Sequence, residues 1–95
     1  MSIDHAWYDR TLLTEAKAIE NLTKKLDYRA LDKIVERLLK AKRSNARVFV
    51  AGCGTSGAAA KRIAHTLSCI EIPGIFLSPA DAPHGAMGMI QPGDV

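Results

Sequence analysis

Residues 47–57 read RVFVAGCGTSG, a short apolar, β-branched run that leads directly into a glycine-rich loop. The run has no helical period and is typical of a buried parallel strand. From residue 58 to residue 70 a helical stripe follows, made of Ala60, Ile63, Ala64, Leu67 and Ile70. After the turn at Pro73-Gly74, residues 75–78 form a second short apolar run. Strand, glycine loop, helix and strand predict one βαβ unit with a right-handed crossover.

Two amphipathic helices are predicted ahead of this unit, at roughly residues 8–25 and 29–43. Apolar residues of the second recur at i, i+3, i+4, i+7 and i+8, namely Leu31, Ile34, Val35, Leu38 and Leu39. Neither helix can bury its stripe alone, so we expect both to pack on the rest of the chain or on another copy.

The end of the chain predicts two further elements. Ser78-Pro79-Ala80-Asp81 has the pattern of a helix start, so a short helix is expected near residues 80–85. Val95 is expected to begin a third strand. Because two parallel strands with one crossover do not close an architecture, the sequence predicts a domain interrupted part-way.

Charge and composition divide the chain into two halves. It has 95 residues, 47% of them hydrophobic and 24% charged, which excludes disordered and collagen-like classes. Residues 1–47 hold 11 of the 13 Lys/Arg and 7 of the 10 Asp/Glu, a net charge of +4, whereas all 7 glycines and all 4 prolines follow. Most basic residues alternate with acidic ones, so nucleic-acid binding is not expected. Chemistry is expected in the second half.

Several other classes are disfavoured by the sequence. No run approaches the ~18 apolar residues of a membrane span, and charged residues stand where a signal peptide needs an apolar core, so we expect a cytoplasmic protein without membrane contact. Cys53 and Cys69 are interpreted as free thiols. No cysteine and histidine spacing predicts a metal site.

The loop Gly52-x-Gly54-x-x-Gly57 is interpreted as a phosphate-binding turn. Glycines let the backbone approach an anion, and Thr55 and Ser56 add hydroxyl donors. The alternative is a tight turn in which one hydroxyl merely caps the helix. The loop lacks the Gly-Lys-Ser/Thr of a mononucleotide P-loop. It also lacks the acidic residue that a dinucleotide fold places after the second strand. A small phosphorylated metabolite fits better.

The loop, the alanine-rich helix after it and the run 78–90, SPADAPHGAMGMI, together resemble a sugar isomerase (SIS) domain. The resemblance covers about residues 10–95 and is greatest to arabinose-5-phosphate isomerases of the KpsF/GutQ type. It implies a partial flavodoxin-like α/β three-layer sandwich with a parallel sheet, preceded by the two amphipathic helices. Residues 1–45 would then be a helical lead-in that packs on the domain. Residues 46–95 would be the N-terminal part of a truncated SIS domain.

For function, the resemblance implies a phosphorylated sugar as ligand and aldose–ketose isomerisation through an enediol, without a cofactor. Gly54, Thr55, Ser56 and Gly57 would bind the phosphate, and His84 would lie near the sugar carbons. The family's glutamate base would lie beyond Val95, so the 95-residue chain is expected to be inactive alone.

Two departures from the family leave a second function open. Thr55 stands where the arabinose-5-phosphate isomerases carry a lysine, and Ala86 stands where they carry an acidic residue. A sugar-phosphate-sensing module that binds without turnover is therefore the alternative. A homo-oligomer formed through the N-terminal helices is expected in both cases. Lys61, one helical turn after the loop, could counter the phosphate charge, although a solvated helix surface is the default interpretation.

Overall fold

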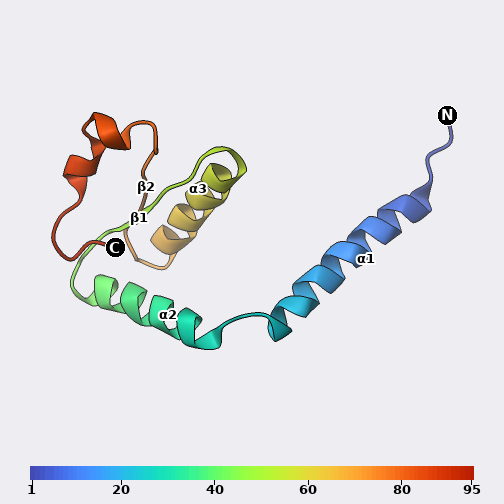
Figure 1. Ribbon diagram of the computed structural model, residues 1–95, viewed down its shortest axis with the longest axis horizontal. Coiled ribbons are helices and arrows are strands. Elements are labelled where there is room, and N and C mark those ends of the chain that lie inside the picture. Colours follow the sequence, from blue (N-terminus) through green and yellow to red (C-terminus); the bar gives the residue numbers. More distant parts are fainter. The chain divides into compact units, whose positions relative to one another are not determined.

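The computed structural model describes residues 1–95, which form two compact units, Met1–Leu31 and Asp32–Val95 (Figure 1). Along the chain lie the helices and strands α1 (His5–Asn21), η1 (Leu22–Lys24), α2 (Tyr28–Arg43), β1 (Val48–Val50), α3 (Gly54–Cys69), β2 (Gly74–Phe76), η2 (Ala82–His84) and η3 (Ala86–Met89). The three η elements are single 3-10 turns. No helix has both the length and the apolar character needed to cross a membrane.

The first unit is built on α1, which begins at a capped N-terminus. The Asp4 carboxylate accepts a hydrogen bond from the Ala6 N–H at 3.0 Å and pairs with Arg10 at 3.3 Å. Such a cap satisfies one of the free donors of the first turn. None of the α1 residues is buried within this unit, and its large apolar side chains include Leu12, Leu13 and Ile19. The apolar stripe predicted for this helix is therefore present and uncovered by its own unit.

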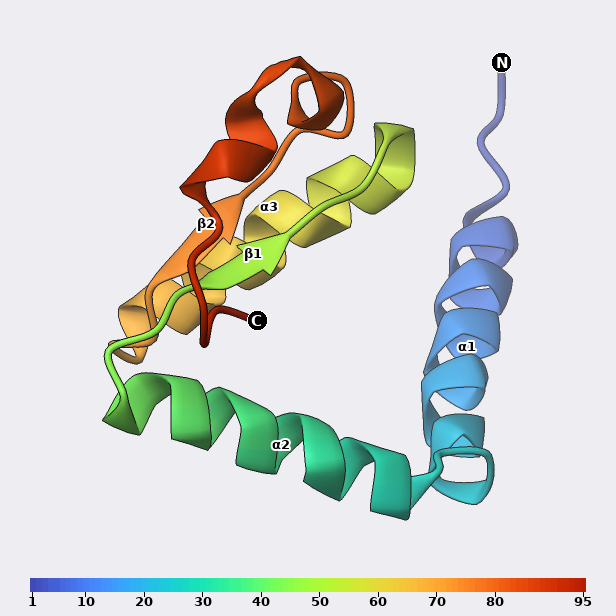
Figure 2. The same cartoon turned by 60° about the vertical axis from the view of Figure 1, so that its left-hand side comes forward.

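The second unit contains a two-stranded parallel sheet. Its register pairs Val48 with Gly74, Phe49 with Ile75 and Val50 with Phe76. Helix α3 connects the two strands and lies along one side of them, while the C-terminal segment follows the other side (Figure 2). The predicted βαβ unit is confirmed. The predicted partial α/β fold is confirmed as well, with a parallel sheet that follows two helices in the sequence.

Small residues bring α3 close to the sheet. The buried residues of the helix are Gly57, Ala60, Ala64 and Leu67. Where Gly74 begins β2, a Cβ would lie only 2.5 Å from the carbonyl oxygen of Ala64, so any side chain there would separate the two elements. Helix and strand can thus pack backbone against backbone at this point.

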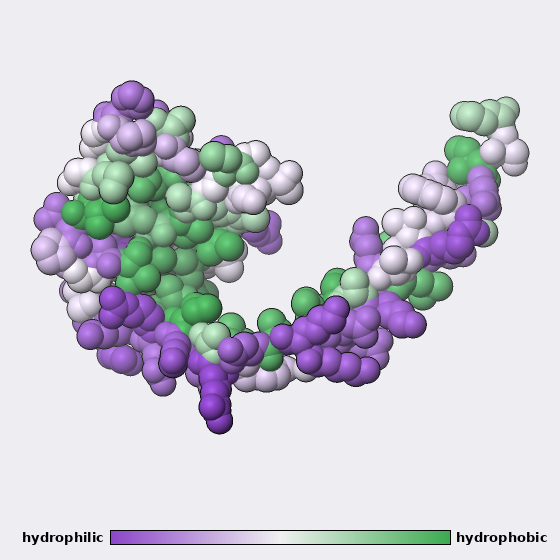
Figure 3. All heavy atoms as spheres, in the orientation of Figure 1, coloured by the Kyte–Doolittle hydropathy of each residue, from purple (hydrophilic) through white to green (hydrophobic).

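The core of the second unit is small and aliphatic. It consists of Ala41, Ala46, Val48, Leu67 and Ile72, with Leu38 and Val50 packed against it. Helix α2 contributes through Ala41, which is buried, so the C-terminal part of this helix belongs to the same core as the strands. Apolar atoms gather on the part of the chain that holds the strands and α3 (Figure 3). The division of the chain at residue 45 into a lead-in and an SIS part stays a prediction.

Three predicted boundaries differ from the structure. Helix α3 begins at Gly54 rather than near residue 58, so the second half of the glycine loop is the first turn of the helix. The first helix ends at Asn21 and continues as a 3-10 turn. The helix expected near residues 80–85 is instead a pair of 3-10 turns, η2 and η3, separated at Gly85, whose φ of +109° interrupts a continuous helix.

Val95 pairs with β1 as the first residue of a third parallel strand would. Its N–H donates to the Arg47 carbonyl at 2.9 Å, and its carbonyl accepts from the Phe49 N–H at 2.7 Å. On the same strand, Val48 donates to Pro73 and Val50 accepts from Leu77, both of which border β2. Because bonding direction alternates along a strand, Val95 and β2 lie on opposite sides of β1.

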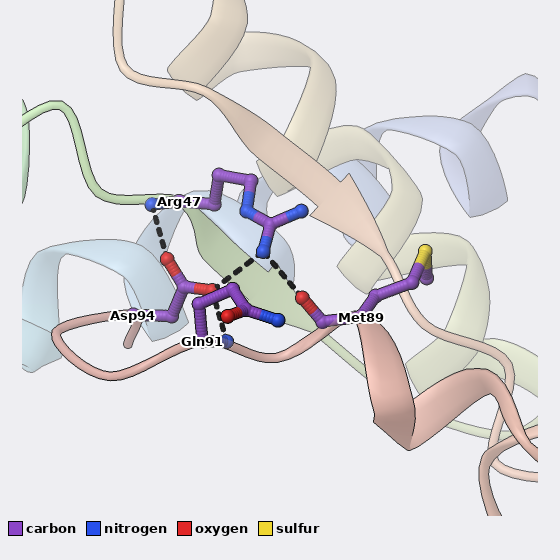
Figure 4. Close-up of polar contacts among 4 residues, drawn as sticks. All are labelled: Arg47, Met89, Gln91 and Asp94. Carbon is purple, nitrogen blue, oxygen red and sulfur yellow. Dashed lines mark hydrogen bonds and ion pairs between the residues drawn. The ribbon is translucent and has the colours of Figure 1, made fainter.

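A carboxylate fixes the turn that brings Val95 to the sheet (Figure 4). Asp94 accepts hydrogen bonds from the backbone N–H of Arg47 at 2.8 Å, from the Arg47 guanidinium at 3.0 Å and from the Gln91 N–H at 2.8 Å. Arg47 also donates to the Met89 carbonyl. The Asp94 side chain is only 4% exposed. These bonds, the Arg47 N–H first and then the Gln91 N–H, hold the pKa of the Asp94 carboxyl below its usual value.

Candidate functional site

The glycine loop ends in an uncapped helix N-terminus. Cys53 is the capping residue of α3, and its side chain makes no capping hydrogen bond. The N–H groups of Gly54, Thr55 and Ser56 lie in the first turn, where a helix supplies no acceptor, and no other carbonyl of the chain accepts from them. The Gly57 N–H donates to the Cys53 carbonyl at 3.2 Å. The start of α3 therefore presents three unpartnered donors.

Each loop glycine has its own structural reason. A Cβ on Gly52 would lie 2.8 Å from the carbonyl group of Ser56, and a Cβ on Gly57 would lie 2.7 Å from the Gly52 oxygen. These two glycines let the loop cross the helix at close range. Gly54 has a φ of +57°, and a Cβ there would meet nothing within 4 Å. Close packing thus explains why Gly52 and Gly57 are glycines, without any ligand. The evidence for an anion-binding site is instead the unpartnered N–H groups of the first turn.

A hollow of about 430 Å³ opens in front of this turn. It is lined by the loop, by the first two turns of α3 and by the end of β2 with the segment after it: Gly52, Cys53, Gly54, Gly57, Ala58, Lys61, Phe76, Ser78, Pro79 and Ala80. Both strands point their carboxyl ends at it, which is where open α/β sheets bind ligands. The volume suits a small metabolite.

The charge around the hollow is positive. Lys61 is the only cation in the lining, and no carboxylate or imidazole lines it. The Lys61 ammonium lies 5.0 Å from the centroid of the Phe76 ring, a cation–π contact. The partial positive charge of the α3 N-terminus has the same sign. An anion is therefore the ligand that this surface favours.

The chain contains no cluster of side chains that could hold a metal ion. No three His, Cys, Asp or Glu side chains lie together. The closest approach to such a group is the Cys69 sulfur, 3.6 Å from the His65 Nε2 one turn earlier on α3. Both cysteines are free and exposed.

Sequence comparison finds relatives among the arabinose 5-phosphate isomerases. The chain is 34% identical over 86 residues to "Arabinose 5-phosphate isomerase KpsF" of Escherichia coli O6:H1 and 41% identical over 86 residues to "Arabinose 5-phosphate isomerase KdsD" of Pseudomonas aeruginosa. Each match covers 90% of this chain and 25% of the relative. No family model matches the chain.

A solved structure similar to this chain also has the name of a sugar-phosphate isomerase. The crystal structure of "a putative sugar-phosphate isomerase" from Listeria monocytogenes superposes with a TM-score of 0.85 at 40% identity, over 99% of this chain and 49% of that one. Over 90% of its length the chain is similar to members of the sugar isomerase (SIS) family. It spans about a quarter of the length of the curated relatives.

The structure brings together only part of the site that the SIS resemblance predicts. Gly54 and Gly57 line the hollow. Thr55 and Ser56 lie on the same turn of α3 with exposed, unbonded hydroxyls, although they are outside the lining. His84 ends the turn η2, is exposed and does not line the hollow. Gly54 and Gly57 therefore border the hollow, Thr55 and Ser56 lie beside them on the first turn of α3, and His84 does not line the hollow.

Ser78 and Phe76 are among the lining residues that were not predicted as site residues. Ser78 lies two residues after the end of β2, and its hydroxyl makes no hydrogen bond. Its place could have been inferred, because the carboxyl ends of neighbouring parallel strands share one edge of the sheet. Phe76 is the last residue of β2 and was read only as part of an apolar strand.

Proposed function

We propose that this chain forms the phosphate-binding part of a sugar-phosphate isomerase. The phosphate would accept hydrogen bonds from the N–H groups of Gly54, Thr55 and Ser56. The observation that carries the proposal is the uncapped first turn of α3. Its three N–H donors have no partner in the chain, and the turn begins at Gly54, which lines the hollow. A helix N-terminus favours anions through both its free donors and its dipole.

The rest of the hollow suits the sugar. Ser78 offers a free hydroxyl, and Phe76 offers an apolar surface of the kind on which a sugar ring or chain packs. Gly57 and Ala58 leave room for a ligand in the hollow, because neither carries more than a methyl group. The names of the relatives make arabinose 5-phosphate the first ligand to test.

The reaction would be aldose–ketose isomerisation through an enediol. A base removes the proton from the carbon next to the carbonyl, the enediol forms, and a proton returns to the neighbouring carbon as the carbonyl moves. No hydride acceptor is required. His84 stays the proposed proton carrier near the sugar carbons, because an imidazole can both accept and donate a proton.

Binding without turnover is the second candidate function. It is favoured by the composition of the lining, which contains neither a carboxylate nor an imidazole to act as base. Incubating the full-length protein with a panel of aldose and ketose phosphates separates the two functions. An isomerase interconverts one pair, whereas a sensor binds a sugar phosphate and yields no product.

The phosphate assignment is tested with hydroxyl deletions. We expect Ser56→Ala to weaken arabinose 5-phosphate binding about tenfold in calorimetric titration, because a hydrogen bond to a charged group is worth roughly 1.5–3 kcal/mol. The matched control is Thr66→Ala on the same helix, whose hydroxyl is bonded to the Arg62 carbonyl at 2.9 Å. Equal affinities for wild type and Ser56→Ala would remove Ser56 from the site.

Assembly and location also stay proposals. A homo-oligomer through the N-terminal helices is supported by the apolar residues that α1 leaves exposed within its own unit, Leu12, Leu13 and Ile19. Sedimentation of the wild type and of a Leu12→Lys variant tests this assembly. A cytoplasmic location is expected from the sequence alone.

A further inference from the structure

Lys61 lies on the face of α3 that carries the loop. It follows Gly54 by seven residues, Gly57 by four and Ala58 by three, and these spacings place all four on one side of a helix. Side chains on a helix lean toward its N-terminus, so Lys61 extends back toward the turn with the free N–H groups. Gly57 and Ala58 carry nothing large enough to stand in between.

Phe76 gives the Lys61 side chain a fixed support. Its ring centroid is 5.0 Å from the Lys61 ammonium, and its backbone is anchored in the sheet by the pairing with Val50. A cation over an aromatic face is attracted to it and loses freedom before any ligand arrives. Such preorganisation lowers the entropic cost of binding an anion.

The Lys61 charge is uncompensated. The ion pairs of the chain join Arg10 to Asp4, Lys42 to Glu71 and Arg47 to Asp94, and none includes Lys61. No carboxylate lines the hollow that Lys61 borders. An exposed lysine is usually solvated, but this one stands at the rim of a hollow together with the positive end of a helix.

We propose that Lys61, held over Phe76, is a specificity-determining residue that selects a phosphomonoester dianion in the hollow. This inference rests on the proposed function. The ammonium adds a full positive charge to the partial charge of the α3 N-terminus, so a dianion gains more than a monoanion and a neutral sugar gains nothing. Because a phosphate monoester takes up its second proton near pH 6, affinity falls as the pH drops through that value.

Arg62 supplies a matched control. It is the adjacent cation on the same helix, it does not line the hollow, and it takes part in no ion pair. Removing its charge changes the net charge of the chain as much as removing that of Lys61. A general electrostatic effect would therefore weaken binding in both variants, and a specific contact only in one.

The experiment titrates arabinose 5-phosphate into wild type, Lys61→Met, Lys61→Arg and Arg62→Met at pH 8 and at pH 5, each at low and at high salt, with circular dichroism as a check of folding. We expect Lys61→Met, which keeps the length of the side chain, to bind about tenfold more weakly and with a flatter dependence on salt and on pH. Lys61→Arg is expected to stay within about threefold of wild type, and Arg62→Met to equal it.

The outcomes separate this inference from the proposed function. If wild type binds and Lys61→Met binds equally well, the role of Lys61 is wrong while the phosphate site stands. If Arg62→Met loses as much affinity as Lys61→Met, the effect is one of net charge and the inference is overturned. If wild type binds no sugar phosphate at all, the proposed function fails and this inference fails with it.

Discussion

Gly57→Ala is expected to destabilise the chain by roughly 1–3 kcal/mol and to abolish sugar-phosphate binding. The added Cβ would lie 2.7 Å from the Gly52 carbonyl oxygen and 3.2 Å from its carbon, both of them backbone atoms. Neither can rotate away as a side chain could, so the loop must separate from α3. Alanine is the better helix former by about 1 kcal/mol, and in open space the substitution would stabilise the helix. Because the clash outweighs the gain in helix propensity, the net effect of Gly57→Ala on stability is unfavourable.

Gly88→Ala is the matched control for this prediction. A Cβ at Gly88 would meet nothing within 4 Å, and its backbone φ is not positive. Urea unfolding and calorimetric titration with arabinose 5-phosphate measure the two effects. A Gly57→Ala variant as stable as wild type, or more stable, would contradict the close crossing of loop and helix.

Asp94→Asn is expected to lower the thermal midpoint at pH 7 by about 5 °C, the order expected when a small domain loses a bonded group. Asparagine keeps the shape, but only one of its terminal atoms accepts hydrogen bonds. The two N–H donors and the guanidinium that meet at Asp94 cannot all be satisfied. The turn that bears Val95 should then loosen from β1.

The same carboxylate makes stability depend on pH, and its sign follows from the lowered pKa. In the folded chain the Asp94 carboxyl holds its proton less tightly than in the unfolded chain, where its pKa is near 3.8. Its contribution is therefore complete above that value and is lost as the pH falls through the folded pKa. We expect the acid-induced fall of the thermal midpoint to be smaller in Asp94→Asn than in wild type.

Asp81→Asn is the control for both measurements, because the Asp81 side chain makes no capping hydrogen bond. Circular dichroism melts from pH 2 to pH 7 compare the three proteins. Identical midpoints and identical pH profiles for wild type and Asp94→Asn would show that the Asp94 bonds contribute nothing.

The local pattern of the second half was sufficient to predict the βαβ unit. Val48, Phe49 and Val50 are apolar without helical period, and the stripe through Ala60, Ala64 and Leu67 marks a helix that packs closely. Both signals depend on residues near one another in the chain. The exact start of α3 could not be read in this way. Gly54 and Gly57 are poor helix formers, and only the structure shows why they stand in the first turn: Gly57 because of its crossing with Gly52, and Gly54 because of its φ of +57°.

The parts of the site that the sequence did not reveal depend on distant contacts. Lys61 and Phe76 are separated by the second half of α3 and the turn before β2, and nothing in the sequence around either residue indicates that they meet. Arg47 and Asp94 are 47 residues apart in the sequence. His84 was predicted from a family resemblance, and its place on an exposed 3-10 turn outside the hollow depends on the left-handed Gly85.

The most direct test of the phosphate site is a titration of the ¹⁵N-labelled chain with arabinose 5-phosphate, followed by amide chemical shifts, with arabinose as the neutral comparison. We predict that the N–H signals of Gly54, Thr55 and Ser56 move saturably with the phosphate ester and stay in place with the free sugar. Signals that remain unmoved at saturating ester, or that move equally with arabinose, would contradict a phosphate site at this turn.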